Sequence, residues 1–555
     1  TKKFKFPNCN CEFPVVGDGE RPQILFDPNI DNITLECEAT WDLISSGNTK
    51  GVFQLESRLG QMLAKKLKPR SIEHLAALVS IMRPGCLEAM RPGEDGKMIS
   101  VTDHYILRKN GEEMVTYFHP ALKNSLESTY GEMIYQEQAM QIARDVAGFT
   151  LQQADILRKA IGKKKADIMA QVKADFMVGV EKTGVVIRPV AEEIFGWIEK
   201  SQRYSFNKSH AVSYAVNAYL SAYAKAHFKR AFFTSYLHFA KEKQKPHEEI
   251  RELINNAKIM DVEVYPPDLR RKNAHFRLIG NNIYFGMTDI KGVGDSAIPK
   301  FEKRLAEVTP VIGGDIGKWT WMDFLIYLSQ KLNKTIVEGL IKVGGLRWMA
   351  VSRQRMWHEY EQYSKLTEKE KEWVTQEYMQ SKFGTPFTTL AESLEDLLIG
   401  PTGRGKGISN KPRHDKITGI LKLVVNPPSP MLDTPAWLSS VEQSLLGISV
   451  TCTAVDECNE HMSNSNCKDY ITGEGRSQNV LLAVQVDDVK QITTKHGDDM
   501  AFLTVSDGSA SLESVVLFPS QWDTHQKLLF AGNTIMLYGE RGKKDSFIVE
   551  NVLQI

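Results

Sequence analysis

Four polar side chains stand together at a predicted helix start, in the run Phe206-Asn-Lys-Ser-His210, which is followed by Ala-Val-Ser-Tyr-Ala. They bring several hydrogen-bond donors to a place where the first backbone N–H groups of the helix also lack partners, and such a combination binds anions. A simpler interpretation is helix capping, in which Asn207 or Ser209 only satisfies the helix end. The residues alone leave both interpretations open.

Further basic side chains lie near this run in the sequence. Between Leu151 and Arg230 the chain carries 14 Lys and Arg against 7 Asp and Glu, although its net charge is only +1. The densest cluster is Leu157-Arg-Lys-Ala-Ile-Gly-Lys-Lys-Lys165, and Met82-Arg-Pro-Gly85 places an arginine on a constrained turn. A basic stretch in a neutral chain is either a solvated surface or one that faces phosphate, and lysines at a helix end also complement its dipole.

Three other patterns are weak candidates for sites. Gly400-Pro-Thr-Gly-Arg-Gly-Lys406 is close to a phosphate-binding P-loop, but Gly407 stands where Ser or Thr must bind Mg²⁺, and an acidic helix precedes it in place of a buried strand. Zinc could be held by two sets of side chains, at intervals unlike those of a common zinc finger: Cys452, Cys458, His461 and Cys467, or Cys9, Cys11 and Cys37. We therefore predict no metal site in this chain.

The hydrophobic pattern indicates the helices that must position these residues. Residues 1–50 are irregular, and a strongly helical segment follows from about residue 51 to residue 243. Within it Ala139, Ile142, Ala143 and Val146 share one face of a helix that ends at Gly148. Dense Tyr and Phe between residues 211 and 240 predict largely buried helix.

The pattern becomes that of strands in two places. His275–Leu278 and Ile283–Phe285 bracket Gly-Asn-Asn and predict a small hairpin. From about Val480 strand-like runs cover residues 481–486, 501–505, 512–518, 534–538 and 547–552, with a helix-like run at 521–530. Short strands with a helix after the third suit an OB-type barrel. Residues 385–430 are expected to form loops around a short acidic helix.

Composition excludes several classes of protein. Hydrophobic residues make up 42% and charged residues 25% of the 555, which is ordinary for a soluble globular protein of several domains. No apolar run approaches the ~18–20 residues of a membrane helix, and the N-terminus has no signal-peptide pattern. Seven cysteines do not make a disulfide framework, which fits a reducing cytosol. We expect a cytoplasmic protein, in a bacterium or an infected host cell, with no membrane partner.

Five motifs in order resemble the fingers of the DNA polymerase III alpha subunit, the C-family polymerase of bacteria and some of their phages. They are Gly51-Val-Phe-Gln-Leu-Glu-Ser57, Met82-Arg-Pro-Gly85, Thr129-Tyr-Gly-Glu-Met-Ile-Tyr-Gln-Glu-Gln138, Leu157–Lys165 and Phe206–His210. The resemblance continues through Tyr265-Pro-Pro-Asp268, Ile290-Lys-Gly-Val-Gly294 and the terminal β-domain. It implies a multidomain, mainly α protein with helical fingers, a tandem helix-hairpin-helix domain and a C-terminal OB-fold barrel.

The resemblance also implies roles for the basic residues. In such polymerases basic side chains of the fingers hold the triphosphate of the incoming dNTP, whose charge requires them. The matching positions are Arg83, Arg158, Lys159, Lys163, Asn207, Lys208 and His210. This chain departs from the family pattern at Cys86, where Pro is usual, and at Ser205, where Gly is usual, and neither departure removes a charged group.

DNA contacts are implied in the second half of the chain. The hairpin Ile290–Gly294 and a looser copy, Leu340-Ile-Lys-Val-Gly-Gly-Leu346, suit the tandem hairpins of the family. Their glycines let backbone N–H groups approach a duplex phosphate without reading the base sequence. The residues assigned to DNA are Lys291, Gly292, Val293, Gly294, Lys342 and Gly344.

The terminal barrel resembles a domain that binds single-stranded DNA by charge and stacking. Lys490, Lys495 and Lys543 are its basic candidates, together with exposed aromatic side chains. Gln526-Lys-Leu-Leu-Phe530 looks like a peptide that binds a sliding clamp. Because it falls where the barrel needs a core helix, we expect Leu528 and Phe530 to be buried.

Nucleotidyl transfer needs carboxylates that bridge two Mg²⁺ ions. In the family they lie on strands of the palm, ahead of Val-Phe-Gln-Leu-Glu-Ser, and no Asp-x-Asp on a hydrophobic strand precedes Val52 here. We therefore expect no catalytic residue in this chain, Mg²⁺ bound by palm carboxylates outside it, and inactivity of the chain alone. The expected partners are primer–template DNA, dNTP, a palm-bearing polymerase chain and a sliding clamp.

The expected organisation is a connector over residues 1–50, fingers over 51–245, a helix-hairpin-helix domain over 246–430, a linker over 431–475 and the OB domain over 476–555. The expected function is template-directed DNA synthesis in replication. The alternative is a non-catalytic DNA-binding factor derived from a polymerase.

Overall fold

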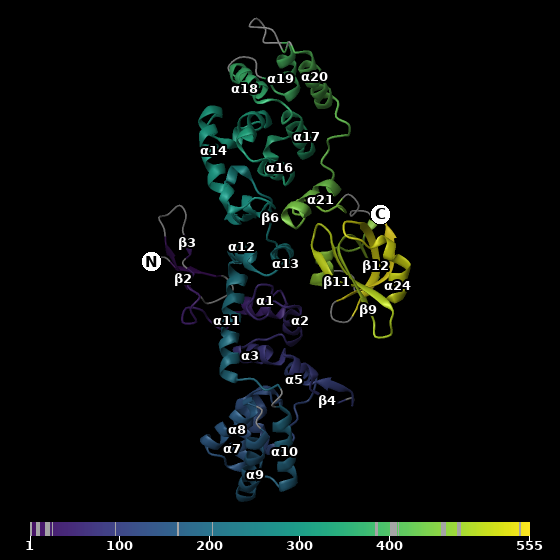
Figure 1. Ribbon diagram of the computed structural model, residues 1–555. Coiled ribbons are helices and arrows are strands. Elements are labelled where there is room, and N and C mark those ends of the chain that lie inside the picture. The colour runs from purple at the N-terminus through teal and green to yellow at the C-terminus, as the bar shows by residue number, and fades with distance from the viewer. Residues whose placement is uncertain are drawn as a thin grey trace. The chain divides into compact units, whose positions relative to one another are not determined.

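The structure is a computed structural model that describes residues 3–6, 12–16, 23–24, 26–94, 96–163, 166–201, 204–382, 387–399, 408, 410–456, 462–473, 479–542 and 546–555 (Figure 1). The chain forms two compact units, Thr1–Phe232 and Phe233–Ile555, and each contains a hydrophobic core of its own. Helices make up 56% of the described residues, and a closed β-barrel lies near the C-terminus. This confirms the predicted fold class.

The first unit is mainly helical. Its helices are α1 (Glu38–Ser45), α2 (Arg58–Leu67), α3 (Ile72–Ile81), α4 (Pro84–Glu88), α5 (Val101–Asn110), α6 (Lys123–Leu126), α7 (Gln136–Ala147), α8 (Leu151–Lys163), α9 (Ala166–Thr183), α10 (Arg188–Ser201) and α11 (Lys208–His227). Strands β4 (Met90–Pro92) and β5 (Met98–Ser100) form a hairpin. Helix α12 (Lys229–Phe239) spans the boundary between the units.

The start of the chain is more ordered than its sequence suggests. Strands β1 (Lys3–Lys5), β2 (Glu12–Val16) and β3 (Gln23–Ile24) form a three-stranded antiparallel sheet where we expected irregular chain. Aromatic packing accounts for the difference, because Phe13 is buried and its ring lies 6.4 Å from those of Tyr223 and Phe228. Such partners are some 200 residues away and leave no local signal.

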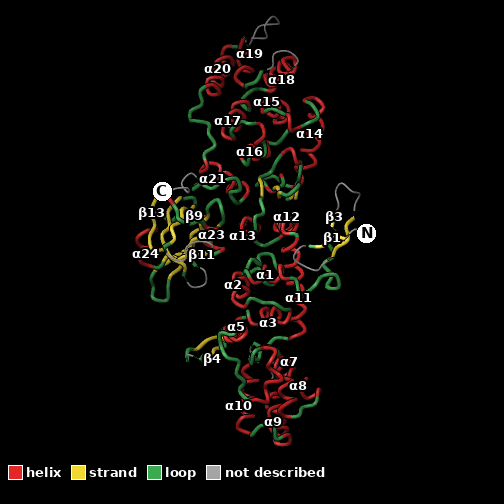
Figure 2. Tube along the Cα trace, turned by 180° about the vertical axis from the view of Figure 1, so that it is seen from behind, coloured by secondary structure: helices red, strands yellow, loops and turns green. Residues whose placement is uncertain are grey.

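Helices α7 to α10 pack into one bundle (Figure 2). The predicted face of α7 is confirmed, since Ala139, Ile142, Ala143 and Val146 are all fully buried. The helix ends at Gly148 with a φ of 65°, the left-handed conformation that glycine adopts without strain. In α9, Gly179 lies so close to α7 that a Cβ there would be 2.2 Å from the carbonyl oxygen of Ala147.

The second unit contains further helices and a small three-stranded sheet. The helices are α13 (Pro246–Ile259), α14 (Ile298–Ile312), α15 (Trp321–Asp323), α16 (Lys334–Lys342), α17 (Arg353–Tyr363), α18 (Glu368–Lys382), α19 (Leu390–Ile399), α20 (Lys411–Val425), α21 (Pro435–Leu446) and α23 (Cys467–Thr472). The predicted hairpin is confirmed as β7 (Arg277–Ile279) and β8 (Asn282–Tyr284), with β6 (Val264–Tyr265) parallel to β8. Helix α20 was not predicted, because its apolar residues are interleaved with basic ones.

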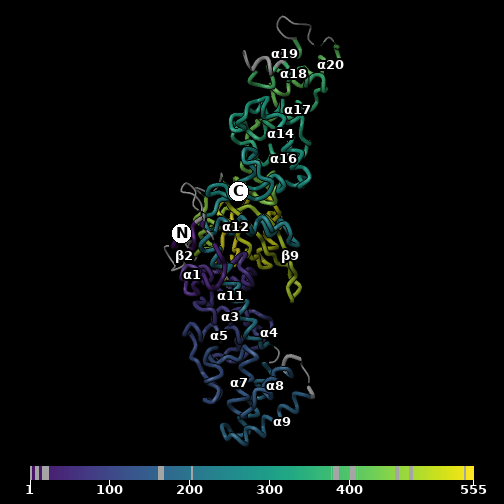
Figure 3. Tube along the Cα trace, turned by 90° about the vertical axis from the view of Figure 1, so that its left-hand side faces the viewer, coloured from purple at the N-terminus to yellow at the C-terminus, as the bar shows by residue number. Residues whose placement is uncertain are grey.

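The barrel confirms the predicted strands one by one. They are β9 (Val480–Thr493), β10 (Asp499–Ser506), β11 (Ser511–Leu517), β12 (Thr534–Arg541) and β13 (Phe547–Gln554), hydrogen-bonded in the order β10-β11-β13-β12-β9 and closed between β9 and β10. Helix α24 (Pro519–His525) follows the third strand, as expected. The far end of the β9–β10 hairpin projects from the barrel (Figure 3).

The expected burial of Phe530 is wrong. Its side chain is 56% exposed, Leu528 is half-buried, and Leu529 fills the core instead. The helix gives way at His525 to a 3₁₀ turn over Gln526–Leu528, and the tighter winding of that turn changes which side chain faces inward.

Two helical glycines give a matched test of the close approach in the α7–α10 bundle. A Cβ on Gly179 would overlap the Ala147 carbonyl, whereas a Cβ on Gly196 of α10 would meet nothing within 4 Å. We expect Gly179→Ala to lower the free energy of unfolding by about 2 kcal/mol or more. Gly196→Ala should raise it by about 0.5–1 kcal/mol, because alanine favours the helix. Urea unfolding measures both, and equal effects would contradict the packing described.

Candidate functional site

The start of α11 is capped within the protein. Asn207 is the N-cap residue, and its Oδ1 accepts a hydrogen bond from the backbone N–H of His210 at 2.9 Å. Its Nδ2 donates to Oε1 of Glu137 at 2.8 Å, and the backbone N–H of Lys208 donates to Oε2 of the same carboxylate at 3.0 Å. Asn207 therefore caps α11. The side chains of Lys208 and His210 remain exposed to solvent.

A short parallel pairing joins this helix start to that of α7. The N–H of Phe206 donates to the carbonyl of Ile134, and the N–H of Gln136 donates to the carbonyl of Phe206, both at 2.9 Å. Glu137 lies in the first turn of α7, so the pairing brings its carboxylate to α11. Two motifs about 70 residues apart thus form one surface.

Arg83 belongs to the same surface. It is the N-cap residue of α4, and its guanidinium lies 3.6 Å from the ring centroid of Phe206, a cation–π contact. The ring of His210 lies between those of Phe206 and Tyr214, with centroids 5.4 and 4.2 Å apart. The structure therefore brings together Arg83, Asn207, Lys208 and His210, which the sequence analysis assigned to one site.

The other basic residues assigned to this site form separate contacts. Arg158 and Lys159 both pair with Asp155 on α8, at 2.7 and 2.8 Å. Hydrogen bonds from Lys159 and Arg158 lower the pKa of Asp155 below its usual value. Among the described residues no hydrogen bond or ion pair joins either side chain to the surface around Phe206. Lys163 is the last residue of α8, and its side chain lies outside the described part.

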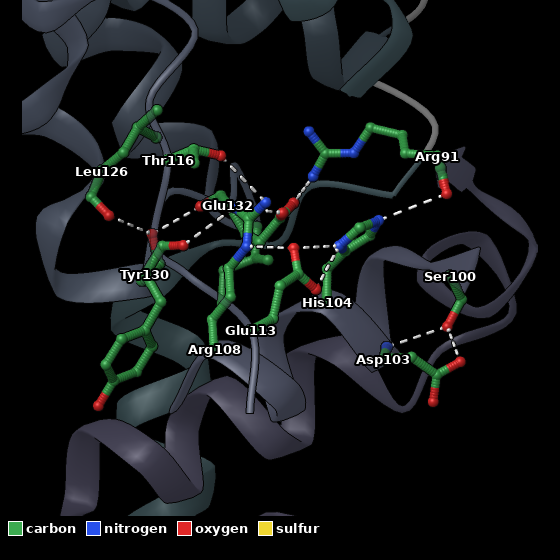
Figure 4. Close-up of polar contacts among 12 residues, drawn as sticks. Arg91, Ser100, Asp103, His104, Arg108, Glu113, Thr116, Leu126, Tyr130 and Glu132 are labelled. Carbon is green, nitrogen blue, oxygen red and sulfur yellow. Dashed lines mark hydrogen bonds and ion pairs between the residues drawn. The ribbon is translucent and has the colours of Figure 1, made fainter. Parts of the chain in front are cut away.

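A buried ion network, absent from the sequence analysis, lies beside the segment that leads to Tyr135 (Figure 4). The side chain of Glu132 is 1% exposed and pairs with Arg91 and with Arg108. Arg108 also pairs with Glu113 at 2.8 Å, and Glu113 meets Nδ1 of His104 at 2.9 Å. The network joins the β4–β5 hairpin, α5 and residue 132, so it holds the approach to the site.

A signal for this network was present in the sequence. Met90-Arg-Pro-Gly93 repeats the Met82-Arg-Pro-Gly85 run eight residues later. Arg91 of the second copy turns inward, where burial lowers the pKa of its guanidinium and the ring of Trp197 lies 5.4 Å away. Arg83 of the first copy faces solvent. The arginine of one copy thus joins the ion network, and the arginine of the other lies on the surface.

The departures from the family pattern leave the surface intact. Cys86 is fully buried within α4, and burial raises the pKa of its thiol to about 12, so it stays neutral. Ser205 is half-buried, and its backbone N–H donates to the carbonyl of Ser201 at 2.8 Å. Neither side chain lies between Arg83 and Phe206.

Helix α11 also anchors the segment before α2. Nζ of Lys225 is fully buried and donates to the carbonyls of Asn48 and Lys50 at 2.8 and 2.7 Å. One turn earlier the hydroxyl of Ser221 accepts from the N–H of Phe53 at 3.1 Å. The same helix therefore carries the exposed basic side chains at its start and fixes residues 48–53 along its length.

The first glycine hairpin of the second unit presents free backbone donors. Gly292 has a φ of 87°, and a Cβ there would lie 3.0 Å from Cγ2 of Thr335. The N–H of Lys291 donates to the carbonyl of Leu445 and that of Val293 to Ile290. Within the described part of the chain, the N–H groups of Gly292 and Gly294 find no acceptor. The side chain of Lys291 is exposed.

Helix α16, which leads into the second glycine run, packs against the first hairpin. A Cβ on Gly339 of α16 would lie 2.7 Å from Cγ2 of Ile290, so α16 supports the first hairpin. The N–H of Gly344 donates to the carbonyl of Ile341 at 3.2 Å. The ammonium of Lys342 lies 3.9 Å from the ring centroid of Trp357. Among the described residues, the N–H of Gly344 therefore has an acceptor, whereas those of Gly292 and Gly294 have none.

The barrel presents one aromatic ring beside a lysine. Phe502 of β10 is 37% exposed and pairs across the strands with Lys490 of β9, which is exposed. Lys495 in the turn between these strands is exposed as well, and Lys543 lies outside the described residues.

Several weaker candidates fall largely outside the described residues. These are the P-loop-like segment 400–406 and the possible zinc ligands Cys9, Cys11, Cys458 and His461. In the part that is described, no group of three His, Cys, Asp or Glu side chains could hold a metal ion. None of the described helices is long and apolar enough to cross a membrane.

Two family models match parts of the chain. Residues 21–184 match the model of the bacterial DNA polymerase III alpha subunit finger domain, and residues 261–356 match that of a helix-hairpin-helix motif. The chain is 32% identical to the DNA polymerase III subunit alpha of Aquifex aeolicus over 92% of its own length and 38% of that protein's. For the subunit of Staphylococcus aureus strain MRSA252 the figures are 28%, 92% and 42%. The chain thus spans about two fifths of the length of these curated relatives.

Lys225 gives stability a distinctive pH dependence. Burial lowers its pKa to about 7, with repulsion from Lys50 adding to the effect. An unfolded lysine titrates near ~10.4, so between these values the unfolded state binds the additional proton and stability rises with pH, by up to about 1.4 kcal/mol per pH unit. Lys225→Met should flatten this rise in urea unfolding between pH 7 and 10. Lys200→Met, at an exposed lysine of α10, is the control, and an unchanged slope in Lys225→Met would contradict the assignment.

Proposed function

Because this chain is related over most of its length to the bacterial DNA polymerase III alpha subunits, we propose that it is part of a replicative DNA-directed DNA polymerase. In this proposal the chain binds the triphosphate of the incoming dNTP and the primer–template DNA. The observation that carries the proposal is the meeting of Arg83, Lys208 and His210 at the joined starts of α4, α7 and α11.

The exposed surface around Phe206 suits a triphosphate. Arg83 offers a planar fork of donors and Lys208 a compact charge, and both face solvent. Glu137 already occupies the side chain of Asn207 and the backbone N–H of Lys208, so phosphate oxygens would meet the side chains rather than the first amides of α11. In this proposal Asn207 positions the helix start, while Arg83, Lys208 and His210 contact the nucleotide. Arg158, Lys159 and Lys163 would join them when α8 meets the substrate.

The carboxylates and Mg²⁺ of nucleotidyl transfer would come from a palm outside these 555 residues. Metal ions held by those carboxylates would support in-line displacement and would neutralise charge on the leaving pyrophosphate. Among the described residues no cluster of such ligands is found. The chain is then inactive by itself and works with a palm-bearing polypeptide in the cytoplasm.

The second unit would hold DNA. The free N–H groups of Gly292 and Gly294 and the ammonium of Lys291 suit a duplex phosphate, and this contact would be independent of sequence. The side chain of Val293 is buried beneath the hairpin and supports its backbone. At the second run the ammonium of Lys342 would contribute charge to DNA binding, because the N–H of Gly344 already has an acceptor within the chain. Phe502 could stack on a base of single-stranded DNA while Lys490 contacts a phosphate. Because Phe530 is exposed, a sliding clamp could bind the segment 526–530.

Removal of one basic side chain tests the nucleotide site. Lys208→Ala should weaken dNTP binding by about 10- to 100-fold, the value of a charge-assisted contact, and leave primer–template affinity unchanged. Titration calorimetry with the chain bound to primer–template measures both. The matched control is Lys182→Ala, at an exposed lysine of α9. A collapse of DNA affinity in Lys208→Ala, with dNTP affinity kept, would show that this surface holds DNA instead.

The role of the Ile290–Gly294 hairpin in DNA binding is tested by the salt dependence of duplex affinity. Replacing Lys291 with Ala should weaken duplex binding equally for unrelated sequences and reduce the slope of log K against log salt by about 1, since one fewer phosphate is neutralised. Fluorescence anisotropy over a salt series gives this slope. Lys422→Ala, at an exposed lysine of α20, should leave it unchanged. A slope that is the same in Lys291→Ala as in the unaltered chain would remove Lys291 from the interface.

A further inference from the structure

A polar pocket of about 140 Å³ lies inside the second unit, among α13, the chain that follows α21 and strands β9 to β11. None of the residues assigned above to dNTP or DNA lines it. A dry engineered cavity of ~150 Å³ accommodates benzene, so this volume holds several waters or one small molecule.

One wall of the pocket consists of donors. Arg251, Asn255 and Lys258 line it at i, i+4 and i+7 of α13, which is one face of a helix. Asn255 is only 8% exposed, and its Nδ2 has no hydrogen-bond acceptor among the described residues. In the same part of the chain the side chains of Arg251 and Lys258 form no hydrogen bond or ion pair. A buried amide without a partner costs about 1–3 kcal/mol, so this wall is built for an acceptor that the chain does not supply.

The opposite wall has little spare accepting capacity. Asp507 already accepts hydrogen bonds from three backbone N–H groups and from the hydroxyl of Ser509. One oxygen of Asp487 accepts from Ser506 at 3.0 Å and from Gln443 at 3.4 Å. The unused groups are thus two cations and an amide N–H₂ against the second oxygen of Asp487. The surplus of donors selects an anion rich in acceptors.

We propose that this pocket binds a small tetrahedral oxyanion, of which inorganic phosphate is the common biological example, between Arg251, Asn255 and Lys258. The guanidinium presents a fork of donors, the ammonium a point charge and the amide the third donor. A bound anion would link α13 to the barrel, because Asp487 and Ser506 belong to β9 and β10. The site is independent of the polymerase role, so the failure of either proposal leaves the other standing.

The charges around the pocket make binding depend on pH. Burial raises the pKa of Asp487 to about 6, opposed by Arg251 and Lys258 and assisted by Asp488. Burial lowers the pKa of Lys258, while the carboxylates of Asp507, Asp456, Glu442 and Asp487 oppose that shift. An anion beside Asp487 favours its protonated form, whose O–H can donate to the anion. Binding therefore takes up a proton and strengthens as pH falls from 8 towards 6.

The test uses the full chain with sulfate and phosphate as probes. Sulfate keeps its charge over this pH range, so its affinity reports the protein's titration alone. Calorimetry at constant ionic strength, balanced with chloride, should show one saturable site that tightens severalfold from pH 8 to pH 6. Arg251→Gln and Lys258→Gln should each weaken sulfate binding at least tenfold. Lys416→Gln, at an exposed lysine of α20, should leave it unchanged.

An isosteric variant guards against loss of folding. Asn255→Asp keeps the shape of the side chain but replaces the N–H₂ group with a carboxylate oxygen, and should abolish binding while circular dichroism stays unchanged. The absence of saturable binding would overturn the proposal and leave the pocket to water. Binding that survives both Arg251→Gln and Asn255→Asp would also overturn it, since the ion would then lie elsewhere.

Discussion

The geometry of the candidate nucleotide surface depends on the carboxylate of Glu137. It accepts hydrogen bonds from the Asn207 side chain and from the backbone N–H of Lys208, and so holds the start of α11 against the first turn of α7. A negative side chain is favourable at both helix N-termini. The parallel pairing of Tyr135 with Phe206 fixes the same junction through the backbone. Without this junction, Phe206 would not lie under Arg83.

Two further sets of contacts hold the surroundings of the junction. Glu132 is held between Arg91 and Arg108 only a few residues before α7 begins. A buried ion network is costly to break, because loss of one partner leaves the others buried and unpaired. At the other end of α11, Lys225 fixes residues 48–53 through two carbonyl groups. The exposed cations are therefore carried on elements that a buried ion network and a buried lysine hold in place.

Features that depend on neighbouring residues could be predicted from the sequence, whereas contacts between distant residues could not. The barrel strands, the hairpin at residues 277–284 and the end of α7 at Gly148 depend on local periodicity and on glycine, and were predicted correctly. The segments around Arg83, Asn207 and Lys208 were singled out by their residue types, and their role in holding a nucleotide came from a resemblance. The roles of Glu137, Glu132 and Lys225 were not, because a carboxylate or lysine gives no local sign of a partner 24 to 177 residues away. Phe530 was misplaced because a turn from α- to 3₁₀-winding is invisible in the hydrophobic pattern.

The central claim is that the triphosphate of a nucleotide lies against the start of α11. Its most direct test is to treat the chain, bound to primer–template, with a deoxynucleoside triphosphate that carries a reactive acyl phosphate, and to locate the acylated lysines by mass spectrometry. Labelling should concentrate on Lys208 and disappear when unmodified dNTP is added in excess. Labelling confined to lysines of residues 233–555, or labelling of Lys208 that excess dNTP does not suppress, would contradict the claim.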